Sequence, residues 1–250
     1  MMNIKNLITL CVITLLTASA GHAQDTETNS TPISSIGKWR INLSGGYGYR
    51  MGNTDDQKDS YIDMGFNESD VDAYFKDIKS GYKLAGQVHY MFWDNMGLGI
   101  DYNFFHTSAS LSGYINSPDI YEYTTLVKIE DDFFTNYIGA SIYTENPLGQ
   151  SQFKLYSQLS LGLSLYREEV LFSYTPLVAT GNNLGVNFEL GLEYEIAKNV
   201  SLGLGISYFA STISKIKFDD GQSTHTMELS DEERESLSRL DMTMGFSFYF

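Results

Sequence analysis

Hydrophobic and polar residues alternate one by one in several segments of the chain. In residues 240–250 the even positions are Leu, Met, Met, Phe, Phe and Phe, whereas the odd positions are Asp, Thr, Gly, Ser and Tyr. Residues 184–196 repeat the pattern, with seven apolar side chains on one face and three glutamates among small residues on the other. A period of two is that of a β-strand, because successive side chains point to opposite faces.

Six more segments alternate similarly, so the sequence predicts eight strands. Their ranges are 38–51, 80–93, 96–110, 133–144, 152–166, 184–196, 199–212 and 238–250. The connections after the second, fourth and sixth strands are short. Those after the first, third, fifth and seventh are long, up to 28 residues in 52–79. Short periplasmic turns that alternate with long external loops are typical of outer-membrane barrels, in which apolar faces meet lipid and polar faces line the bore. The predicted fold is therefore an all-β, eight-stranded antiparallel up-and-down transmembrane β-barrel.

Aromatic residues gather at the predicted periplasmic ends of these strands. Amphipathic rings favour the boundary between lipid and water, so such residues are expected to form a girdle around a barrel. The predicted girdle consists of Trp39, Phe92, Trp93, Tyr143, Phe153, Tyr194, Phe248 and Phe250.

The N-terminus predicts export. Lys5 precedes an apolar run from Leu7 to Leu16, and small residues up to Ala23 fit a cleavage site, so residues 1–23 are expected to be a signal peptide. Residues 24–37 are polar and are predicted to be a flexible periplasmic leader to a barrel domain at 38–250. Cleavage would remove Cys11, the only cysteine, which would exclude disulfides and thiolate chemistry from the mature chain.

Composition narrows the function classes. The formal net charge is -15, which argues against nucleic-acid binding because that requires a basic face. After the signal peptide no run of about 18 apolar residues occurs, so no transmembrane helix is expected. Together with the strand pattern, these features predict a protein of the outer membrane of a Gram-negative cell.

The eight alternating strands, the loop alternation and the terminal segment from Met244 to Phe250 resemble the small outer-membrane β-barrels of the OmpA/OmpX type. The resemblance covers about 38–250. It implies that the barrel-assembly machinery recognises the last strand, which ends on the aromatic Phe250. The shared pattern is architectural, so it does not select one activity among those that such barrels host.

Charged residues on the predicted polar faces are expected to meet in the bore. An eight-stranded barrel is only wide enough for its side chains to fill, and buried charges are costly unless they are paired. We therefore predict a salt-bridged plug, in which Glu189 and Glu193 pair with Arg40 or Lys154, and the alternative is a narrow channel. The predicted network comprises Arg40, Arg50, Lys83, Asp101, Lys154, Glu189, Glu193 and Glu195.

One nucleophilic pattern is present. His106 and Ser108 share the outward face of the third strand, and an acid such as Glu122 would complete a triad. The pattern resembles the His-x-Ser-Asn motif of the lipid A deacylase family, although Ala109 stands in the place of the Asn. The resemblance implies an alternative function as an outer-membrane lipid A-modifying hydrolase. The acidic pairs Asp55-Asp56 and Asp219-Asp220 could bind divalent cations, but no loop has the spacing of an EF-hand, so neither a metal site nor a cofactor is predicted.

The external loops are acidic. Residues 52–79 carry eight Asp or Glu, and Val71, Tyr74, Phe75 and Ile78 recur there at helical spacing, which predicts a short amphipathic helix over the barrel mouth. Loops 52–79 and 217–237 are therefore candidate surfaces for an external partner, alongside outer-membrane lipid and lipopolysaccharide. The sequence favours a non-enzymatic barrel with an envelope-structural or surface-interaction role.

Overall fold

The structure is a computed structural model that describes residues 39–116, 124–173, 175–219, 221–230 and 234–250. These residues belong to one compact unit. The predicted signal peptide (1–23) and leader (24–37) lie outside them, as does Glu122. Export and cleavage therefore stay predictions.

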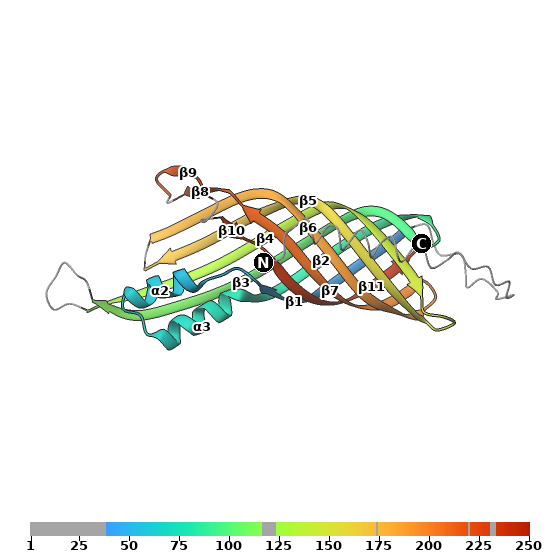
Figure 1. Cartoon of the computed structure of the whole chain (residues 1–250), viewed down its shortest axis with the longest axis horizontal. Helices are drawn as coiled ribbons and strands as arrows, with labels where there is room; N and C mark the ends of the chain where they lie inside the picture. The colour runs from blue at the N-terminus through green and yellow to red at the C-terminus, as the bar shows by residue number, and fades with distance from the viewer. Residues whose placement is uncertain (1–38, 117–123, 174, 220, 231–233) are drawn as a thin grey trace. The chain divides into compact units, whose positions relative to one another are not determined.

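Eight strands form a closed antiparallel ring, which confirms the predicted fold class (Figure 1). Around the ring they are β1 (Trp39–Arg50), β2 (Ser80–Trp93), β3 (Met96–Asn116), β4 (Thr124–Pro147), β5 (Phe153–Phe172), β6 (Thr175–Ala197), β7 (Val200–Ile213) and β11 (Arg239–Tyr249). The first and last strands close the ring with a register that pairs Arg40 with Tyr249 and Arg50 with Arg239. Closure satisfies the backbone hydrogen bonds that a bilayer cannot satisfy. Among the described helices, none is long and apolar enough to cross a membrane.

The alternation of side chains follows the predicted pattern through the middle of the barrel. In β11, Met242 and Met244 are more than half exposed on the outer face, whereas Asp241 and Ser247 are fully buried on the inner face. In water this arrangement would expose a wide apolar band, which soluble monomers avoid. It fits a wall that contacts lipid.

Beyond this band the strands continue further than predicted. In these extensions the apolar residues face inward and the polar residues face outward, the reverse of the pattern used to predict the strands. The sequence pattern predicts loops at 111–132 and 167–183, but β3, β4, β5 and β6 extend through much of these segments. On β4, Lys128, Glu130 and Asp132 point outward, while Val127 and Ile129 are buried inside. A polar outer face and an apolar inner face are what strands require above the bilayer, where water surrounds the barrel.

Three short strands add to this external region. β8 (Lys215–Asp219) and β9 (Thr224–Glu228) form a hairpin whose first strand pairs with the extension of β6, and β10 (Glu235–Ser236) pairs with β7. All five residues of β9 are exposed. Much of the segment predicted as the loop 217–237 is thus ordered into a projecting hairpin (Figure 1).

The first loop contains the predicted helix. α3 (Glu68–Lys79) starts where the side chain of Asn67 accepts a hydrogen bond from the backbone N–H of Ser69 at 2.9 Å, a typical N-cap. The four residues of the predicted apolar stripe are buried against inward residues of the strands, including Phe105 and Phe133. α2 (Asp55–Asp63) has no buried residue and carries acidic side chains. The helical loop therefore caps an apolar core at the external end of the barrel.

Of the eight residues predicted to form the aromatic girdle, six are exposed, Phe248 is half-buried and one points into the bore. Trp39, Phe92, Trp93, Phe153, Tyr194 and Phe250 are each more than a third exposed. Tyr143 instead points into the bore and is fully buried. Its position in β4 has the parity of the lumen-facing residues, so the inward face, rather than the strand end, determines its environment.

Candidate functional site

Arg40 lies at the centre of a buried polar network near the periplasmic end of the bore. Its Nη2 is 2.6 Å from Glu193 Oε1 and donates to Ser247 Oγ at 3.0 Å, while Nη1 donates to Gln87 Oε1 at 3.3 Å. The guanidinium also stacks over the Tyr143 ring, 4.0 Å from its centroid. The side chains of Arg40 and Glu193 are 0% and 1% exposed. The arrangement brings together one of the predicted pairs.

Tyr249 links this network to a second ion pair. Its hydroxyl oxygen lies 2.8 Å from Glu193 Oε2 and 2.8 Å from Glu145 Oε2. Lys154 Nζ in turn lies 3.1 Å from Glu145 Oε1. Lys154 thus pairs with Glu145 rather than with Glu189 or Glu193 as predicted.

A second charged layer lies farther along the bore. Asp241 accepts from both sides, with Oδ2 3.2 Å from Lys83 Nζ and Oδ1 3.1 Å from Arg239 Nε. Arg239 Cζ also lies 4.3 Å from the centroid of the Phe209 ring. All three charged side chains are at most 1% exposed. Cation and carboxylate are therefore paired where water is excluded, as buried charges require.

The remaining predicted residues have different environments. Asp101 accepts from Ser160 and Asn187, at 2.8 and 3.0 Å. Glu189 accepts from the Tyr156 hydroxyl at 2.7 Å, and in the described ion pairs it has no cationic partner. Glu195 is half-buried beside the bulge between Glu195 and Ala197, and Arg50 stacks over the Phe133 ring near the external end.

Sequence reasoning missed three members of the network. The sequence pattern places Glu145 in a periplasmic turn, but β4 runs to Pro147 and brings its side chain inside. Arg239 and Asp241 have the parity of the polar face of the last strand, so that alternation was the signal that could have assigned them.

The outward pair His106 and Ser108 has a different neighbour from the one expected. His106 Nε2 lies 3.1 Å from Asp132 Oδ1, and its ring packs between Tyr82 and Phe134, with centroids 5.2 and 4.5 Å away. Asp132 faces Ser108 across the β3–β4 ladder. Among the hydrogen bonds of the described residues, none joins His106 to Ser108. The site has an acid and a base in contact, but not a base in contact with a nucleophile.

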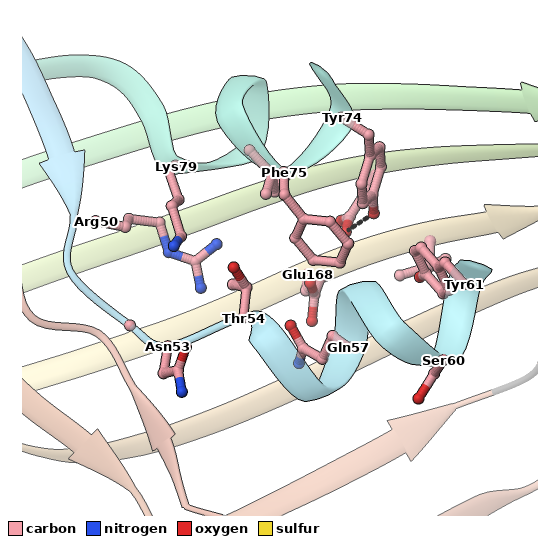
Figure 2. Close-up of a pocket in the computed structure, with 14 residues that line it drawn as sticks. Arg50, Asn53, Thr54, Gln57, Ser60, Tyr61, Tyr74, Phe75, Lys79 and Glu168 are labelled. Carbon is pink, nitrogen blue, oxygen red and sulfur yellow. Dashed lines mark hydrogen bonds between the residues drawn. The ribbon is translucent and has the colours of Figure 1, made fainter. Parts of the chain in front are cut away.

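A cavity of about 330 Å³ lies between the helical loop and the external ends of β1, β4 and β5 (Figure 2). Two carboxylates, Asp131 and Glu168, line it together with the rings of Tyr61, Tyr74 and Phe75. The cationic side chains of Arg50 and Lys79 also line it and lie next to one another in the figure. The sequence did not predict this cavity, because both carboxylates fall in segments whose pattern predicts loops.

Comparisons with known proteins agree with this architecture. The sequence profile of the outer membrane protein beta-barrel domain family matches residues 53–230, so the chain belongs to this family and is an outer-membrane β-barrel protein. A comparison with curated protein sequences found no significant match.

Several solved structures are similar to this chain at 16% sequence identity or less. Neisserial surface protein A is 16% identical, with a TM-score of 0.46, 87% of this chain covered and 100% of that one. A major outer membrane protein from Thermus thermophilus is 9% identical, with a TM-score of 0.49 and coverage of 85% and 99%. Outer membrane protein W of E. coli is 12% identical, with a TM-score of 0.31 and coverage of 87% and 100%.

Proposed function

We propose that this protein is a non-conducting outer-membrane barrel that presents its external loops to a partner at the cell surface. The observation that carries the proposal is the state of the bore, most of whose charged side chains are buried and held by ion pairs or by hydrogen bonds. A water-filled channel would leave such side chains exposed. Eight strands enclose a bore that side chains can fill, so a transport role is disfavoured relative to a role of the loops.

The exposed helix α2 indicates the chemistry of the partner. Asp55, Asp56, Asp59 and Asp63 lie on this helix, of which only the Tyr61 side chain packs against the core. Opposite charges accelerate association and favour partners with the complementary sign. The loop therefore matches a positively charged partner. Alternatively, divalent cations could bridge its carboxylates to the phosphates of lipopolysaccharide.

Site-specific labelling of intact cells tests the surface role. The mature chain is expected to lack cysteine, so Thr226→Cys in the exposed strand β9 would provide a single thiol outside the cell. A membrane-impermeant maleimide should label this variant on intact cells. The matched variant Ser151→Cys, in the turn between β4 and β5, should be labelled only after the outer membrane is permeabilised. Equal labelling of both variants on intact cells would contradict the proposal.

The partner's charge requires a separate test. Neutralising Asp55, Asp56 and Asp59 to Asn should abolish the salt-sensitive binding of a lysine-rich peptide, or the Mg²⁺-dependent binding of lipopolysaccharide. Unchanged binding of both probes would rule out α2 as the interaction surface.

The contact between His106 and Asp132 favours one second candidate, a lipid A-modifying hydrolase that uses Ser108 as its nucleophile. These residues lie on the outward face, where β3 and β4 leave the lipid-facing band. Hydrolysis would require His106 to turn toward Ser108, because its Nε2 is engaged with Asp132. Loss of a lipid A acylation change in Ser108→Ala cells would identify this activity, and its absence in wild-type cells would exclude it.

A further inference from the structure

Above the lipid-facing band the sheet is open, and β3 and β9 each present an edge. The pairing of β3 with β2 ends where His106 lies opposite Tyr82. Beyond this point the helical loop covers β3, since Thr107 Oγ1 lies 3.0 Å from the carbonyl oxygen of Asp77 and 2.6 Å from that of Ser80. The strand β9, at the top left of Figure 1, pairs only with β8 among the described strands, and all its residues are exposed. The edge of β9 is therefore bare.

One hydrogen bond beside β9 shows which backbone groups face this edge. The N–H of Leu229 donates to the carbonyl oxygen of Ser214 at 2.9 Å, so these two opposite residues form a hydrogen-bonded pair of the antiparallel ladder. Hydrogen-bonded and non-hydrogen-bonded pairs alternate along such a ladder. Thr224, Thr226 and Glu228 therefore lie in non-hydrogen-bonded pairs with β8. Their N–H and C=O groups point away from β8, toward the bare edge.

The sequence of β9 does not protect this edge. Natural edge strands usually avoid pairing with other chains through proline, lysine, a β-bulge or a covering segment. The strand reads Thr-His-Thr-Met-Glu, and its register with β8 is unbroken from Thr224 to Glu228. One edge of the external sheet is thus covered by the helical loop, whereas the other is open to pairing with a further strand.

The side chains of β9 define the chemistry of a matching strand. Glu228 lies on the outer face, where its side chain is 81% exposed although it is 3.2 Å from Lys215. Met227 lies on the opposite face beside the buried Ile216 and is 49% exposed. Opposite charges and apolar side chains on neighbouring strands stabilise each other when they lie directly opposite. The matching strand therefore alternates basic or polar residues with apolar ones.

We propose that the free edge of β9 binds an extended segment of a partner polypeptide as an additional antiparallel strand, with a basic residue opposite Glu228 and an apolar residue opposite Met227. In strand addition the main-chain hydrogen bonds supply affinity and the alternate side chains supply specificity. The inference rests on the proposed surface role for the location of the hairpin, but the contact is separate from the acidic helix α2. Peptide binding in micelles tests the edge alone, whereas labelling of intact cells tests its location.

A peptide with the sequence of residues 213–219 is a suitable probe, because it contains β8, the strand that pairs with β9 in the structure. Its two lysines can lie opposite Glu228 and Thr226, and its apolar residues opposite Met227 and His225. Fluorescence anisotropy of the labelled peptide with the refolded full-length chain in detergent micelles should show saturable binding. A peptide of the same composition without the alternation should bind about tenfold more weakly or less. No saturable binding of the first peptide would overturn the proposal.

Methylation of single peptide nitrogens locates the hydrogen bonds without altering the protein. The peptide residue that corresponds to Lys217 would direct its N–H toward Thr226, whereas the residue that corresponds to Ile216 would direct its N–H away from β9. Methylation at the first position should weaken binding by about tenfold or more, and methylation at the second by less than about threefold. Equal effects, or a larger effect at the second position, would contradict strand addition at this edge.

Two substitutions at Thr226 test the same bond from the side of the protein. Thr226→Pro removes the outward N–H but keeps the bonds to β8, because an edge strand tolerates proline where its N–H faces away from the ladder. Thr226→Val is the matched control, since it keeps both the N–H and the branched shape. The proline variant should weaken peptide binding by about tenfold or more, and the valine variant by less than about twofold. Equal binding by the two folded variants, checked by heat-modifiable gel migration, would show that the peptide binds elsewhere.

Size-exclusion chromatography of the chain without peptide tests a different occupant of the edge. The proposal predicts the same elution volume in micelles for the wild type, Thr226→Pro and Thr226→Val. A wild-type dimer that Thr226→Pro dissociates and Thr226→Val preserves would show that a second copy of the chain occupies the edge, and the assignment to a different polypeptide would be wrong.

Discussion

Glu193→Gln removes one charge from a fully buried ion pair of the bore and leaves the size of the side chain unchanged. Arg40 would keep its hydrogen bonds to Gln87 and Ser247 but lose the carboxylate 2.6 Å from its Nη2. At this separation the Coulomb attraction is roughly 6 kcal/mol for an effective dielectric constant of about 20, and roughly 1.6 kcal/mol in water. Desolvation cancels much of the larger value in the intact pair, but removal of one partner leaves a buried charge uncompensated. We therefore expect the free energy of unfolding to fall by about 3–5 kcal/mol.

The chain offers a matched control for this substitution. Arg167 and Glu169 are also 2.6 Å apart, but their side chains are 54% and 46% exposed. Glu169→Gln should therefore cost less than about 1 kcal/mol. Both pairs join an arginine to a glutamate at the same distance. A difference between the two variants in the loss of free energy of unfolding would therefore result from the burial of the Arg40 pair.

Reversible urea unfolding in detergent micelles, followed by tryptophan fluorescence and by the unboiled gel band, provides the measurement. A double variant, Arg40→Met with Glu193→Gln, should recover part of the lost stability, because it removes the uncompensated cation. If Glu193→Gln and Glu169→Gln had the same small effect, water would screen the Arg40 pair. The description of the bore as a dry, paired plug would then be wrong.

Three further predictions concern the external end and the outward face. Asp131 has a raised pKa of about 8 in the folded protein against about 3.9 for a free Asp, so its contribution to stability is present below about pH 4 and is lost as the pH rises through 8. Amide hydrogen exchange of α3, corrected for the intrinsic effect of pH, should therefore quicken over this interval, and Asp131→Asn should flatten the change. Phe75→Ala should create a cavity worth about 3–5 kcal/mol in the external core and expose 52–79 to added protease, whereas Ile62→Ala on the exposed helix α2 should not. Ser108→Ala should leave the lipid A acyl pattern of expressing cells unchanged in mass spectra, and a changed pattern would favour the hydrolase.

The barrel was predictable because its wall obeys one local rule. In β11 every second residue faces lipid, so the period of two in the sequence corresponds directly to the burial pattern. The helix α3 was predictable for a similar reason, since the spacing of Val71, Tyr74, Phe75 and Ile78 shows the face that becomes buried. Both patterns are readable without knowing which strands or helices are neighbours.

The extent of β3 to β6 was not predictable from the same rule. Above the bilayer the polar and apolar faces exchange: Glu130 points outward and Ile129 is buried inside. A rule that expects apolar residues on the outer face therefore predicts that the strand ends before these residues. The cavity could not be predicted for the same reason, because its two carboxylates lie in these strand extensions. Asp131 and Glu168 meet only because β4 and β5 pair beyond the lipid-facing band, with Phe133 opposite Glu168. The pattern along one segment does not give the register between β4 and β5, because the register depends on how far the two strands stay paired.

The choice of ion partners was also beyond the pattern. The alternation of residues along each strand correctly placed Arg40, Lys83, Lys154 and Glu193 inside the bore. It could not give the level of each residue along the barrel axis, because the strands are tilted. Lys154 pairs with Glu145 because the turn between β4 and β5 keeps the ends of these strands adjacent, with Glu145 opposite Tyr156 in the register. Pairing of this kind requires the three-dimensional arrangement.

Planar-bilayer recording of the refolded protein tests the central claim, a closed barrel whose bore is filled by buried charged and polar side chains. Heat-modifiable gel migration first establishes that the inserted protein is folded. The structure predicts no stable conductance for the wild-type chain at any applied voltage that the bilayer withstands. A stable single-channel conductance that changes in Glu193→Gln would contradict the claim, because it would show that ions pass the Arg40 layer.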